Sequence, residues 1–208
     1  SAGFYHYLFE LFILEVLNMF DRFITLIGEE NFKLIENTSV LLLGVGGVGG
    51  YVAEALVRSG IKKLTIVDDD NVELTNLNRQ IIALHSTIGL PKVEVMKTRL
   101  EDINPSVYIT PKKIHLEENL DDLDFEKYDY IVDCIDDVPV KVSLAKKALD
   151  EGLNLIMSTG TAKKLDPSKL MMTTLAKTSH DPLARKLRHL LRGYDTKKVV
   201  VLSSSEAP

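Results

Sequence analysis

The sequence predicts an α/β protein in which helices cover both faces of a doubly wound, mostly parallel sheet. Two observations lead to this prediction. Short apolar runs and helical patterns alternate from residue 38 onward, as the strands and crossover helices of a parallel sheet do. The run at 39–44 also ends in a glycine-rich turn that leads directly into a helical pattern. At 208 residues the chain is long enough for one well-packed domain.

The individual elements are predicted from the spacing of apolar residues. Strands are expected at residues 39–44, 63–68, 107–109, 128–135, 153–158, 169–174 and 198–203. Helices are expected at residues 48–59, 90–103, 138–150 and 182–192. The spacing predicts that three of these helices bury Val52, Ala55, Leu56 and Ser59, then Val93, Met96, Leu100 and Ile103, and finally Leu183, Leu187, Leu190 and Leu191.

The composition is that of an ordinary soluble globular protein, with 26% charged and 45% hydrophobic residues. The net charge of −5 gives no general attraction to nucleic acid or to a membrane surface. Cys134 is the only cysteine, which excludes an internal disulfide and a zinc site built from paired CxxC motifs. A single cysteine also fits a reducing cytoplasm.

Cys134 and the histidines are not interpreted as catalytic or metal-binding groups. Cys134 lies in the apolar run YIVDCID without a neighbouring histidine, where cysteine behaves as a small hydrophobic residue. Four histidines lack the spacing of metal ligands and are interpreted as surface or loop residues: His85, His115, His180 and His189.

The glycine-rich turn, Gly44-x-Gly46-x-x-Gly49, has the context of a dinucleotide-binding fingerprint. Its glycines permit a tight turn, a close approach of the backbone to phosphate, and close packing of helix on strand. The helix that follows presents free N–H groups to an anion. Asp68 ends the next strand, about 20 residues on, where a carboxylate can accept from ribose hydroxyls. NAD and ATP fit this pattern equally well.

The chain divides into three segments around this turn. Residues 1–37 are predicted to form N-terminal helices, residues 38–160 a Rossmann-like core, and residues 161–208 an extension of the same domain. The apolar start carries Glu10 and Glu15, which argue against a membrane span, and it lacks the basic region of a signal peptide. We expect an amphipathic helix there that packs on the body or on a second subunit; a natural start at Met19 is the alternative.

The loop after Asp68 favours ATP over NAD. Asn76, Arg79 and Lys92 place one amide and two cations within a short span. Attack of a carboxylate on an α-phosphate spreads negative charge over phosphoryl oxygens, and fixed cations stabilise that charge. Hydride transfer creates no comparable charge. Taken singly, each cation is better explained as a solvated surface residue.

Several motifs together resemble the ubiquitin-activating superfamily, the adenylating enzymes that include those of molybdopterin and thiamine biosynthesis. The resemblance rests on GVGGVGG, VDDDNVELTNLNRQ, GLPKVEVM, DINP and DCIDD, across about residues 22–145. Within this superfamily, KLDPSKL, LAKTSHDPLARKLRHLLR and VVVLSSSEAP resemble the tRNA threonylcarbamoyladenosine dehydratase family. Sulfur-carrier-activating relatives generally have paired CxxC zinc motifs and often a catalytic cysteine, and this chain has neither. The family is expected to continue beyond Pro208, so the resemblance implies a truncated C-terminus.

The resemblance implies a role for each matching residue. The residues implied in ATP binding are Gly44, Gly46, Gly47, Gly49, Asp68, Asp70, Asn76, Arg79, Gln80, Lys92 and Asp136. Arg79 and Lys92 stabilise charge, Asp136 coordinates Mg²⁺, and Arg22 enters the site of the partner in a homodimer. Three other carboxylates are close enough in sequence to be confused with Asp136, namely Asp70, Asp133 and Asp137. The resemblance further implies a monovalent cation, a cysteine desulfurase system as a partner, no membrane, and a cytoplasmic location.

The reaction implied is ATP-dependent adenylation of the threonyl carboxylate of tRNA threonylcarbamoyladenosine, followed by intramolecular ring closure with loss of water. A tethered nucleophile in the modified base displaces AMP, so no protein thioester is needed. Three alternatives stay open. They are adenylation of the C-terminus of a ubiquitin-like sulfur carrier, an NAD-dependent oxidoreductase, and a non-catalytic nucleotide-binding module.

One segment of this acidic chain is basic. Residues 177–198 carry seven basic residues against two acidic ones. Asp181 suits the N-cap of a helix and Pro182 its first position. The spacing places Arg185, Arg188 and Arg192 together on the solvent side. With the family resemblance, we predict a tRNA-binding surface made of Arg185, Lys186, Arg188 and Arg192.

Overall fold

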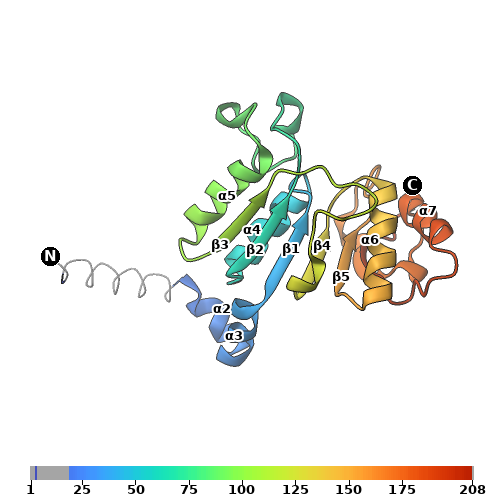
Figure 1. Cartoon of the computed structure of the whole chain (residues 1–208), viewed down its shortest axis with the longest axis horizontal. Helices are drawn as coiled ribbons and strands as arrows, with labels where there is room; N and C mark the ends of the chain where they lie inside the picture. The colour runs from blue at the N-terminus through green and yellow to red at the C-terminus, as the bar shows by residue number, and fades with distance from the viewer. Residues whose placement is uncertain (1–2, 4–18, 208) are drawn as a thin grey trace.

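The computed structural model describes residue 3 and residues 19–207, and these contain the predicted doubly wound sheet. Its strands lie in the order β3-β2-β1-β4-β5-β7-β6 (Figure 1). All neighbouring strands are parallel except β6, which runs antiparallel to β7. The strands are β1 (Ser39–Leu43), β2 (Lys63–Val67), β3 (Tyr108–Lys112), β4 (Tyr130–Asp133), β5 (Leu155–Ser158), β6 (Leu170–Thr174) and β7 (Val200–Ser204).

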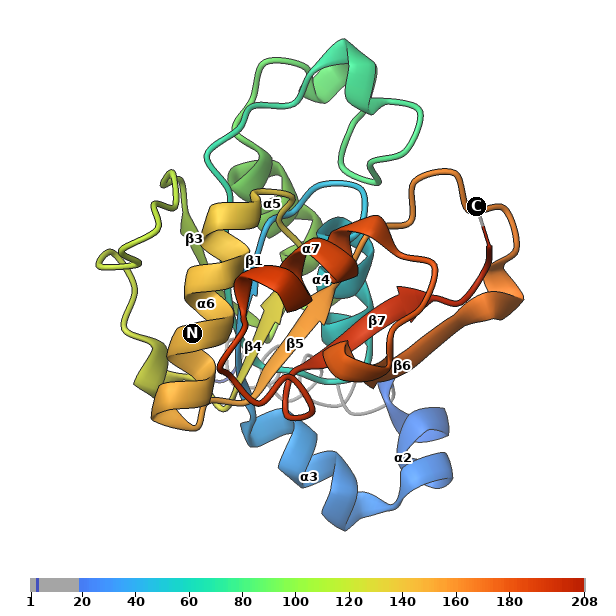
Figure 2. The same ribbon diagram turned by 90° about the vertical axis from the view of Figure 1, so that its right-hand side faces the viewer.

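Helices cover both faces of this sheet, which confirms the predicted fold class. The helices are α2 (Asp21–Ile27), α3 (Glu29–Asn37), α4 (Gly49–Arg58), α5 (Lys92–Ile103), α6 (Val138–Glu151) and α7 (Pro182–Leu190). Short 3-10 turns occur at Leu74–Asn76, His85–Thr87, Phe125–Lys127, Pro167–Lys169 and Leu175–Lys177. Helices α6 and α7 pack on the face seen in Figure 2, and α4 and α5 pack on the opposite face.

A hydrophobic core lies on each face of the sheet. Strand β1 contributes to both cores because its side chains alternate between the two faces. Leu41 and Leu43 pack with α6 and α7, whereas Val40 and Leu42 pack with α4 and α5. All four are buried. A central parallel strand is covered on both faces, so its sequence is a continuous apolar run.

The N-terminal helices lie at the end of the sheet where the strands begin (Figure 1). Phe32 of α3 is buried and packs on Phe20, with 5.1 Å between ring centroids. It also packs against Gly60, where an added Cβ would lie 2.6 Å from the Phe32 ring. The amphipathic helix predicted for the apolar start falls mainly on residues 1–2 and 4–18, outside the described residues. Among the described residues, no helix is both long enough and apolar enough to cross a membrane.

The inner face of α4 differs from the prediction. Its buried residues are Gly49, Gly50, Ala53 and Val57, while Ala55 is exposed. The two glycines bring the first turn of the helix against the backbone of Gly44 and Val45, while Val52 and Leu56 of the predicted face are partly buried against the core. The spacing of apolar side chains alone could not show this, because glycine contributes no apolar side chain.

The end of α7 also differs from the prediction. The helix ends at Leu190, which is 43% exposed, whereas Leu191 is fully buried after the helix. Leu187 and Ala184 form its buried stripe, and Leu183 is half-buried. The inward placement of Leu190 was therefore wrong, because the chain leaves the helical path at that residue.

Candidate nucleotide-binding site at the switch point of the sheet

The strand order reverses around β1, which has β2 on one side and β4 on the other. Parallel sheets bind ligands in the crevice at such a switch point, outside the carboxyl ends of the strands. Three predicted site segments meet there. The glycine-rich turn follows β1, Asp68 follows β2, and the run from Asp133 to Asp137 begins at the last residue of β4.

The glycine-rich turn is shaped by close backbone contacts. Gly44 has a φ of +84°, and an added Cβ would lie 3.0 Å from the carbonyl oxygen of Cys134. A Cβ on Gly49 would lie 1.8 Å from the carbonyl oxygen of Gly44, so only glycine fits. Helix α4 begins at Gly49 and directs its first N–H groups into the crevice.

Asp68 ties the end of β2 to the glycine-rich turn. Its carboxylate accepts hydrogen bonds from the Val45 N–H at 2.8 Å and from the Asp70 N–H at 3.0 Å. Burial raises the pKa of the Asp68 carboxyl, although these hydrogen bonds and Lys92 favour its charged form. Each carboxylate oxygen has a further lone pair, so Asp68 can still accept from a ribose hydroxyl.

Lys92 reaches the same place from the first residue of α5. Its side chain is 7% exposed, and its Nζ lies 2.6 Å from Asp70 Oδ2 and 3.8 Å from Asp68 Oδ1. The Lys92 N–H also donates to the carbonyl of Asp70 at 3.0 Å. A buried cation therefore lies beside Asp68, whose carboxylate is hydrogen-bonded to the glycine-rich turn. Asn76 is also buried, and its Oδ1 accepts from the Glu73 N–H at 3.0 Å.

Arg79 and Gln80 lie over the glycine-rich turn. A Cβ on Gly47 would lie 3.6 Å from Arg79 Cγ, and one on Gly46 would lie 3.7 Å from Gln80 Nε2. The guanidinium of Arg79 donates to the carbonyl of Thr75 and to Asn78 Oδ1, both at 3.0 Å. Gln80 is buried, and its Oε1 has no hydrogen-bond partner among the described residues.

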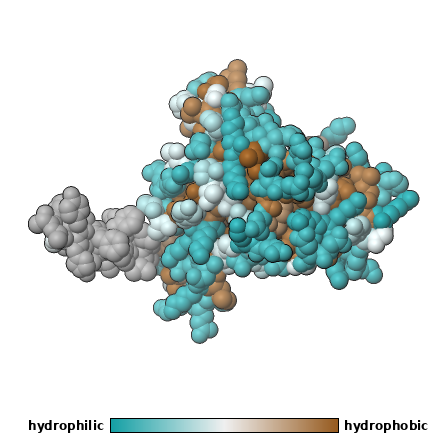
Figure 3. Space-filling view, viewed as in Figure 1, coloured by the Kyte–Doolittle hydropathy of each residue, from teal (hydrophilic) through white to brown (hydrophobic). Residues whose placement is uncertain are grey.

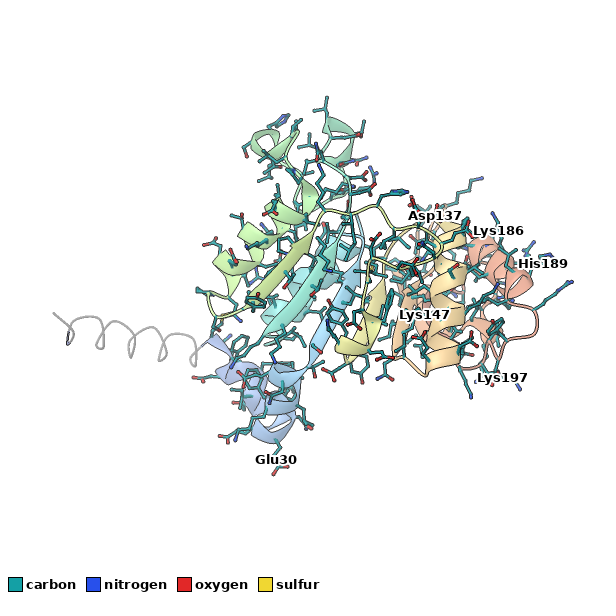
Figure 4. The ribbon with its side chains drawn as sticks, viewed as in Figure 1. Glu30, Asp137, Lys147, Lys186, His189 and Lys197 are labelled. Carbon is teal, nitrogen blue, oxygen red and sulfur yellow. The ribbon has the colours of Figure 1, made fainter. Side chains whose placement is uncertain are left out.

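The three carboxylates that follow β4 have different environments. Asp133 is fully buried and pairs with Lys141 at 2.8 Å. Asp137 is the N-cap of α6 and accepts from the Val140 N–H at 2.9 Å, and Figure 4 shows it at the crevice end of the helix. Asp136 is exposed, and no group of the described residues donates a hydrogen bond to its carboxylate. Of the three, Asp136 is therefore the exposed carboxylate that no described residue engages.

The structure reveals a residue that the sequence analysis missed, Lys141. Its side chain is fully buried, and its Nζ donates to Asp133 and, at 2.8 Å, to the carbonyl of Ser158. Burial raises the pKa of the Asp133 carboxyl, while Lys141 acts in the opposite direction. A lysine on the same helical stripe as Leu144, Ala145 and Ala148 was the pattern that could have indicated this burial.

A second group of carboxylates lies beside the site. Oxygens of Asp68, Asp69 and Asp70 come within 4.8 Å of one another. Each carboxylate already has a partner, since Asp69 contacts His115 Nδ1 at 2.7 Å. The hydrogen bond that the His115 ring donates to the Asp69 carboxylate raises the pKa of His115. This group is therefore a set of satisfied ion pairs and hydrogen bonds, and Asp136 does not belong to it.

Cys134 has the properties of a core residue. Its sulfur-bearing Cβ packs 3.3 Å from the position that a Cβ of Gly49 would occupy. Burial raises the pKa of the thiol to about 12. The thiol is therefore protonated at neutral pH, which agrees with the prediction that it is no nucleophile. The predicted surface histidines His85, His115, His180 and His189 are all exposed.

Arg22 is not part of this site within one chain. It is exposed on α2, and Figure 1 shows α2 at the end of the sheet opposite to the crevice. Unlike the glycine-rich turn and Asp68, Arg22 therefore does not lie at the switch point of its own chain. Its predicted role requires a second copy of the chain.

The predicted basic surface is smaller than expected. Arg185, Lys186 and Arg192 are exposed, and Figure 4 shows Lys186 pointing outward from α7. Arg188 instead turns toward the protein, where its guanidinium donates to the carbonyls of Leu175 and Thr178 and to the Thr178 hydroxyl. The placement of Arg188 on the solvent side was therefore wrong. The predicted N-cap is confirmed, since Asp181 accepts from the Ala184 N–H at 3.0 Å.

Comparison with known proteins identifies the family of the chain. Residues 20–184 match the ThiF family. The chain is 42% identical over 195 residues to the tRNA threonylcarbamoyladenosine dehydratase of Bacillus subtilis, which covers 93% of the chain and 77% of that protein. It is 39% identical over 168 residues to the Escherichia coli protein of the same name, covering 80% of the chain and 63% of that protein.

A solved structure shows the same fold. The E. coli tRNA N6-threonylcarbamoyladenosine dehydratase, TcdA, in complex with ATP superposes with a TM-score of 0.84 at 34% identity. The match covers 91% of this chain and 82% of that chain. The chain belongs to the ThiF family and, within it, to the tRNA threonylcarbamoyladenosine dehydratases.

Proposed function

We propose that the chain catalyses ATP-dependent adenylation of the threonyl carboxylate of tRNA threonylcarbamoyladenosine, followed by ring closure with net loss of water. The observation that carries this proposal is the meeting of a glycine-rich helix start, an acidic residue and two cations at one switch point. Gly49, Asp68, Arg79 and Lys92 come from separate parts of the sequence to this crevice. The names of the relatives supply the substrate.

ATP would lie across the carboxyl ends of the strands, between the ends of β2 and β4. The free N–H groups of the glycine-rich turn and of α4 suit its phosphates, and Asp68 suits its ribose. Asn76 and Gln80 can orient the phosphates with amide groups. The unpartnered Oε1 of Gln80 supports this role, because a buried amide oxygen without a partner is costly unless a ligand satisfies it.

Arg79 and Lys92 would stabilise the adenylation step. An oxygen of the threonyl carboxylate attacks the α-phosphorus, and the bond from this phosphorus to pyrophosphate breaks. Negative charge grows on the phosphoryl oxygens and on the leaving pyrophosphate. Two cations beside the glycine-rich turn act where this charge develops, and burial of Lys92 strengthens its field.

Ring closure needs no nucleophile from the protein. A carbamoyl oxygen or nitrogen of the same modified base attacks the activated carbonyl carbon, and AMP leaves with the original carboxylate oxygen. The two reacting groups are tethered, so their effective concentration is high. The high pKa of Cys134 supports a mechanism without a thioester and disfavours an enzyme that forms one.

Asp136 is the residue that we propose for Mg²⁺. Mg²⁺ prefers oxygen ligands and is commonly held by one or two carboxylates together with phosphate oxygens. The exposed and unpaired carboxylate of Asp136 at the crevice fits this preference. Bound there, the ion would neutralise phosphate charge. No contact of the described residues supports the monovalent cation or the cysteine desulfurase partner, so the proposal includes neither.

We further propose a homodimer, with Arg22 entering the crevice of the partner. Arg22 lies on α2, at the end of the sheet opposite to the crevice of its own chain (Figure 1), so only a second copy could bring it to a crevice. The long loop before α5 also exposes several large apolar side chains, and Figure 3 shows apolar surface on this projecting part of the molecule. These residues are Leu74, Leu84, Ile88 and Leu90. A second subunit is the common way to cover such surface.

For the tRNA we propose the exposed cations of α7 and of the turn after it, namely Arg185, Lys186 and Arg192. Strand β7 places this segment beside the core, because β7 pairs with β5 in the same sheet. The same pairing supports residues 161–208 as an extension of one domain. A tRNA substrate and a single buried cysteine fit the cytoplasm as the location.

The decisive experiment is mass analysis of nucleosides from tRNA incubated with the protein, ATP and Mg²⁺. The modified adenosine should lose one water only when ATP is present. Melting temperatures with ATP and with NAD provide the control, because a ligand raises the melting temperature of the state that binds it. Stabilisation by NAD alone would contradict the proposal, and unchanged nucleosides beside a sulfur carrier that becomes adenylated would favour the alternative adenylyltransferase.

A further inference from the structure

The buried ion pair of Lys141 and Asp133 joins three elements at the crevice. Asp133 is the last residue of β4, Lys141 lies in the first turns of α6, and Ser158 is the last residue of β5. Lys141 Nζ lies 2.8 Å from Asp133 Oδ2 and 2.8 Å from the carbonyl oxygen of Ser158. Both charged side chains are fully buried. Removing two charges from water is expensive, and apolar residues of similar size often stabilise a fold equally well.

The pair therefore calls for a role other than stability, and the turn beside it suggests one. Asp133 Oδ1 accepts from the Ile135 N–H at 3.1 Å, and Asp137 caps α6 through the Val140 N–H. The turn is thus held at both of its ends, and Asp136 lies between them. The side chain of Asp136 makes no hydrogen bond among the described residues, so its position depends on how the backbone between Asp133 and Asp137 is held.

The backbone between Asp133 and Asp137 also contacts the glycine-rich turn. The carbonyl oxygen of Cys134 lies 3.0 Å from the position of a Cβ on Gly44, and the Cys134 N–H donates to the Leu43 carbonyl at 2.8 Å. A shift of the segment after Asp133 would therefore change the distance between Asp136 and the glycine-rich turn. An ion held by Asp136 and by phosphate oxygens is sensitive to that distance.

We propose that Lys141 is a positioning residue that sets the affinity of the site for Mg²⁺-bound ATP by fixing Asp136 relative to the glycine-rich turn. This inference rests on the proposed assignment of Asp136 to Mg²⁺. Lys141 itself touches neither the nucleotide nor the ion. Its ion pair with Asp133 and its hydrogen bond to Ser158 act through the backbone between Asp133 and Asp137.

The test is a double-mutant cycle read by calorimetric ATP affinity. The quantity measured is the ratio of the Kd for ATP in EDTA to that in saturating Mg²⁺. We expect Lys141→Met to lower this ratio by about tenfold, as losses of residues that orient metal ligands do. Asp136→Asn should lower it at least as much. Because Lys141 acts through Asp136, adding Lys141→Met to Asp136→Asn should then have little further effect.

Two further variants guard against an effect of misfolding. Asp133→Asn/Lys141→Met removes both charges and leaves no buried charge unpaired, so it should keep a folded core while losing the Mg²⁺ effect. Lys147→Met is the matched control on the same helix, because Lys147 pairs with Glu151 at 2.6 Å away from the crevice. It should keep the ratio of the wild type.

The outcomes separate this inference from the proposed function. In one outcome, Asp136→Asn abolishes the Mg²⁺ effect while Lys141→Met and Asp133→Asn/Lys141→Met keep the wild-type ratio. Lys141 then has only a structural role and the inference is wrong. If Asp136→Asn itself keeps the ratio, the metal assignment fails, and the positioning role fails with it. Conversion of tRNA by the wild-type protein reports on the proposed function independently of both results.

Discussion

Lys92 Nζ lies 2.6 Å from Asp70 Oδ2, so a cation proposed for the phosphates of ATP is paired with a carboxylate before ATP binds. The two side chains differ in burial, because Lys92 is 7% exposed and Asp70 is 64% exposed. Asp70 can therefore turn into solvent at little cost, while Lys92 stays in the crevice. ATP would displace Asp70 from the ammonium group.

This exchange predicts that Asp70→Asn strengthens ATP binding. The substitution removes a competitor for Lys92 and a negative charge near the phosphates. A partly exposed ion pair contributes about 0.2–1 kcal/mol, so we expect the Kd for ATP to fall by about 1.4- to fivefold. Calorimetric titration measures this change, and Asp122→Asn is the control, because Asp122 is exposed and lies outside the crevice. A weaker affinity would show that Asp70 itself contacts the nucleotide or its ion.

Arg79→Ala and Lys92→Ala should each lower the rate of adenylation by about 10²–10³, as the loss of one fixed donor to a transition state does. The melting temperature should change little. Arg79 is exposed, and the loss of Lys92 leaves Asp70 free to reach solvent. Release of pyrophosphate from ATP in the presence of substrate tRNA measures the rate. Normal turnover in both variants would mean that other residues stabilise the phosphates.

The fold was predictable from sequence because parallel strands are buried on both faces, so β1 and β2 are short and rich in apolar residues. The nucleotide crevice was partly predictable, because Gly44, Gly49 and Asp68 obey a local rule of spacing. The contact of Lys92 with Asp70 was not, since 22 residues separate them and the intervening loop decides where α5 begins.

The orientation of two side chains, Arg188 and Lys141, could not be predicted from helical spacing. Arg188 has the spacing of a solvent-facing residue, but the turn at Leu175–Lys177 offers it backbone carbonyls. Lys141 has the chemistry of a surface residue, but Asp133 and the Ser158 carbonyl compensate its burial. In both cases the partner lies outside the helix that carries the charged side chain. Helical spacing describes one element alone and contains no information about that partner.

Cys134 should be almost inert toward alkylation in the folded protein. With a pKa of about 12 the thiolate fraction at pH 8 is on the order of 10⁻⁴, whereas a free cysteine is about one-quarter ionised. We expect mass spectrometry to show alkylation by iodoacetamide at least about 10³ times slower than in the guanidinium-unfolded chain. Cys134→Ala should retain conversion of the tRNA. If Cys134→Ala loses conversion of the tRNA while its melting temperature is unchanged, the thiol takes part in the reaction.

The proposed dimer predicts complementation between two inactive chains. Arg22→Ala and Asp136→Ala should each lower activity, because each removes a residue from every site of its homodimer. A mixed dimer has one site in which both residues are intact, and it should recover up to half of the wild-type activity. Tandem purification of differently tagged chains isolates this dimer. A monomer in light scattering at the assay concentration would exclude the role of Arg22 in the partner's site.

The exposed and the inward-turned arginines of the α7 region should respond differently to substitution. Arg185→Ala/Lys186→Ala/Arg192→Ala removes three solvated charges. It should weaken tRNA binding and reduce the slope of log affinity against log salt by up to about 3, or by about 2 if the cations contact single-stranded loops. ATP affinity should stay unchanged.

Arg188→Ala should instead destabilise the fold by about 1–3 kcal/mol, because the carbonyls of Leu175 and Thr178 lose a charged donor. Its salt slope should equal that of the wild type. Titrations of tRNA at several salt concentrations, together with urea unfolding, separate the two effects. An unchanged slope in the triple variant would place the tRNA elsewhere on the protein, and a reduced slope in Arg188→Ala would return that residue to the binding surface.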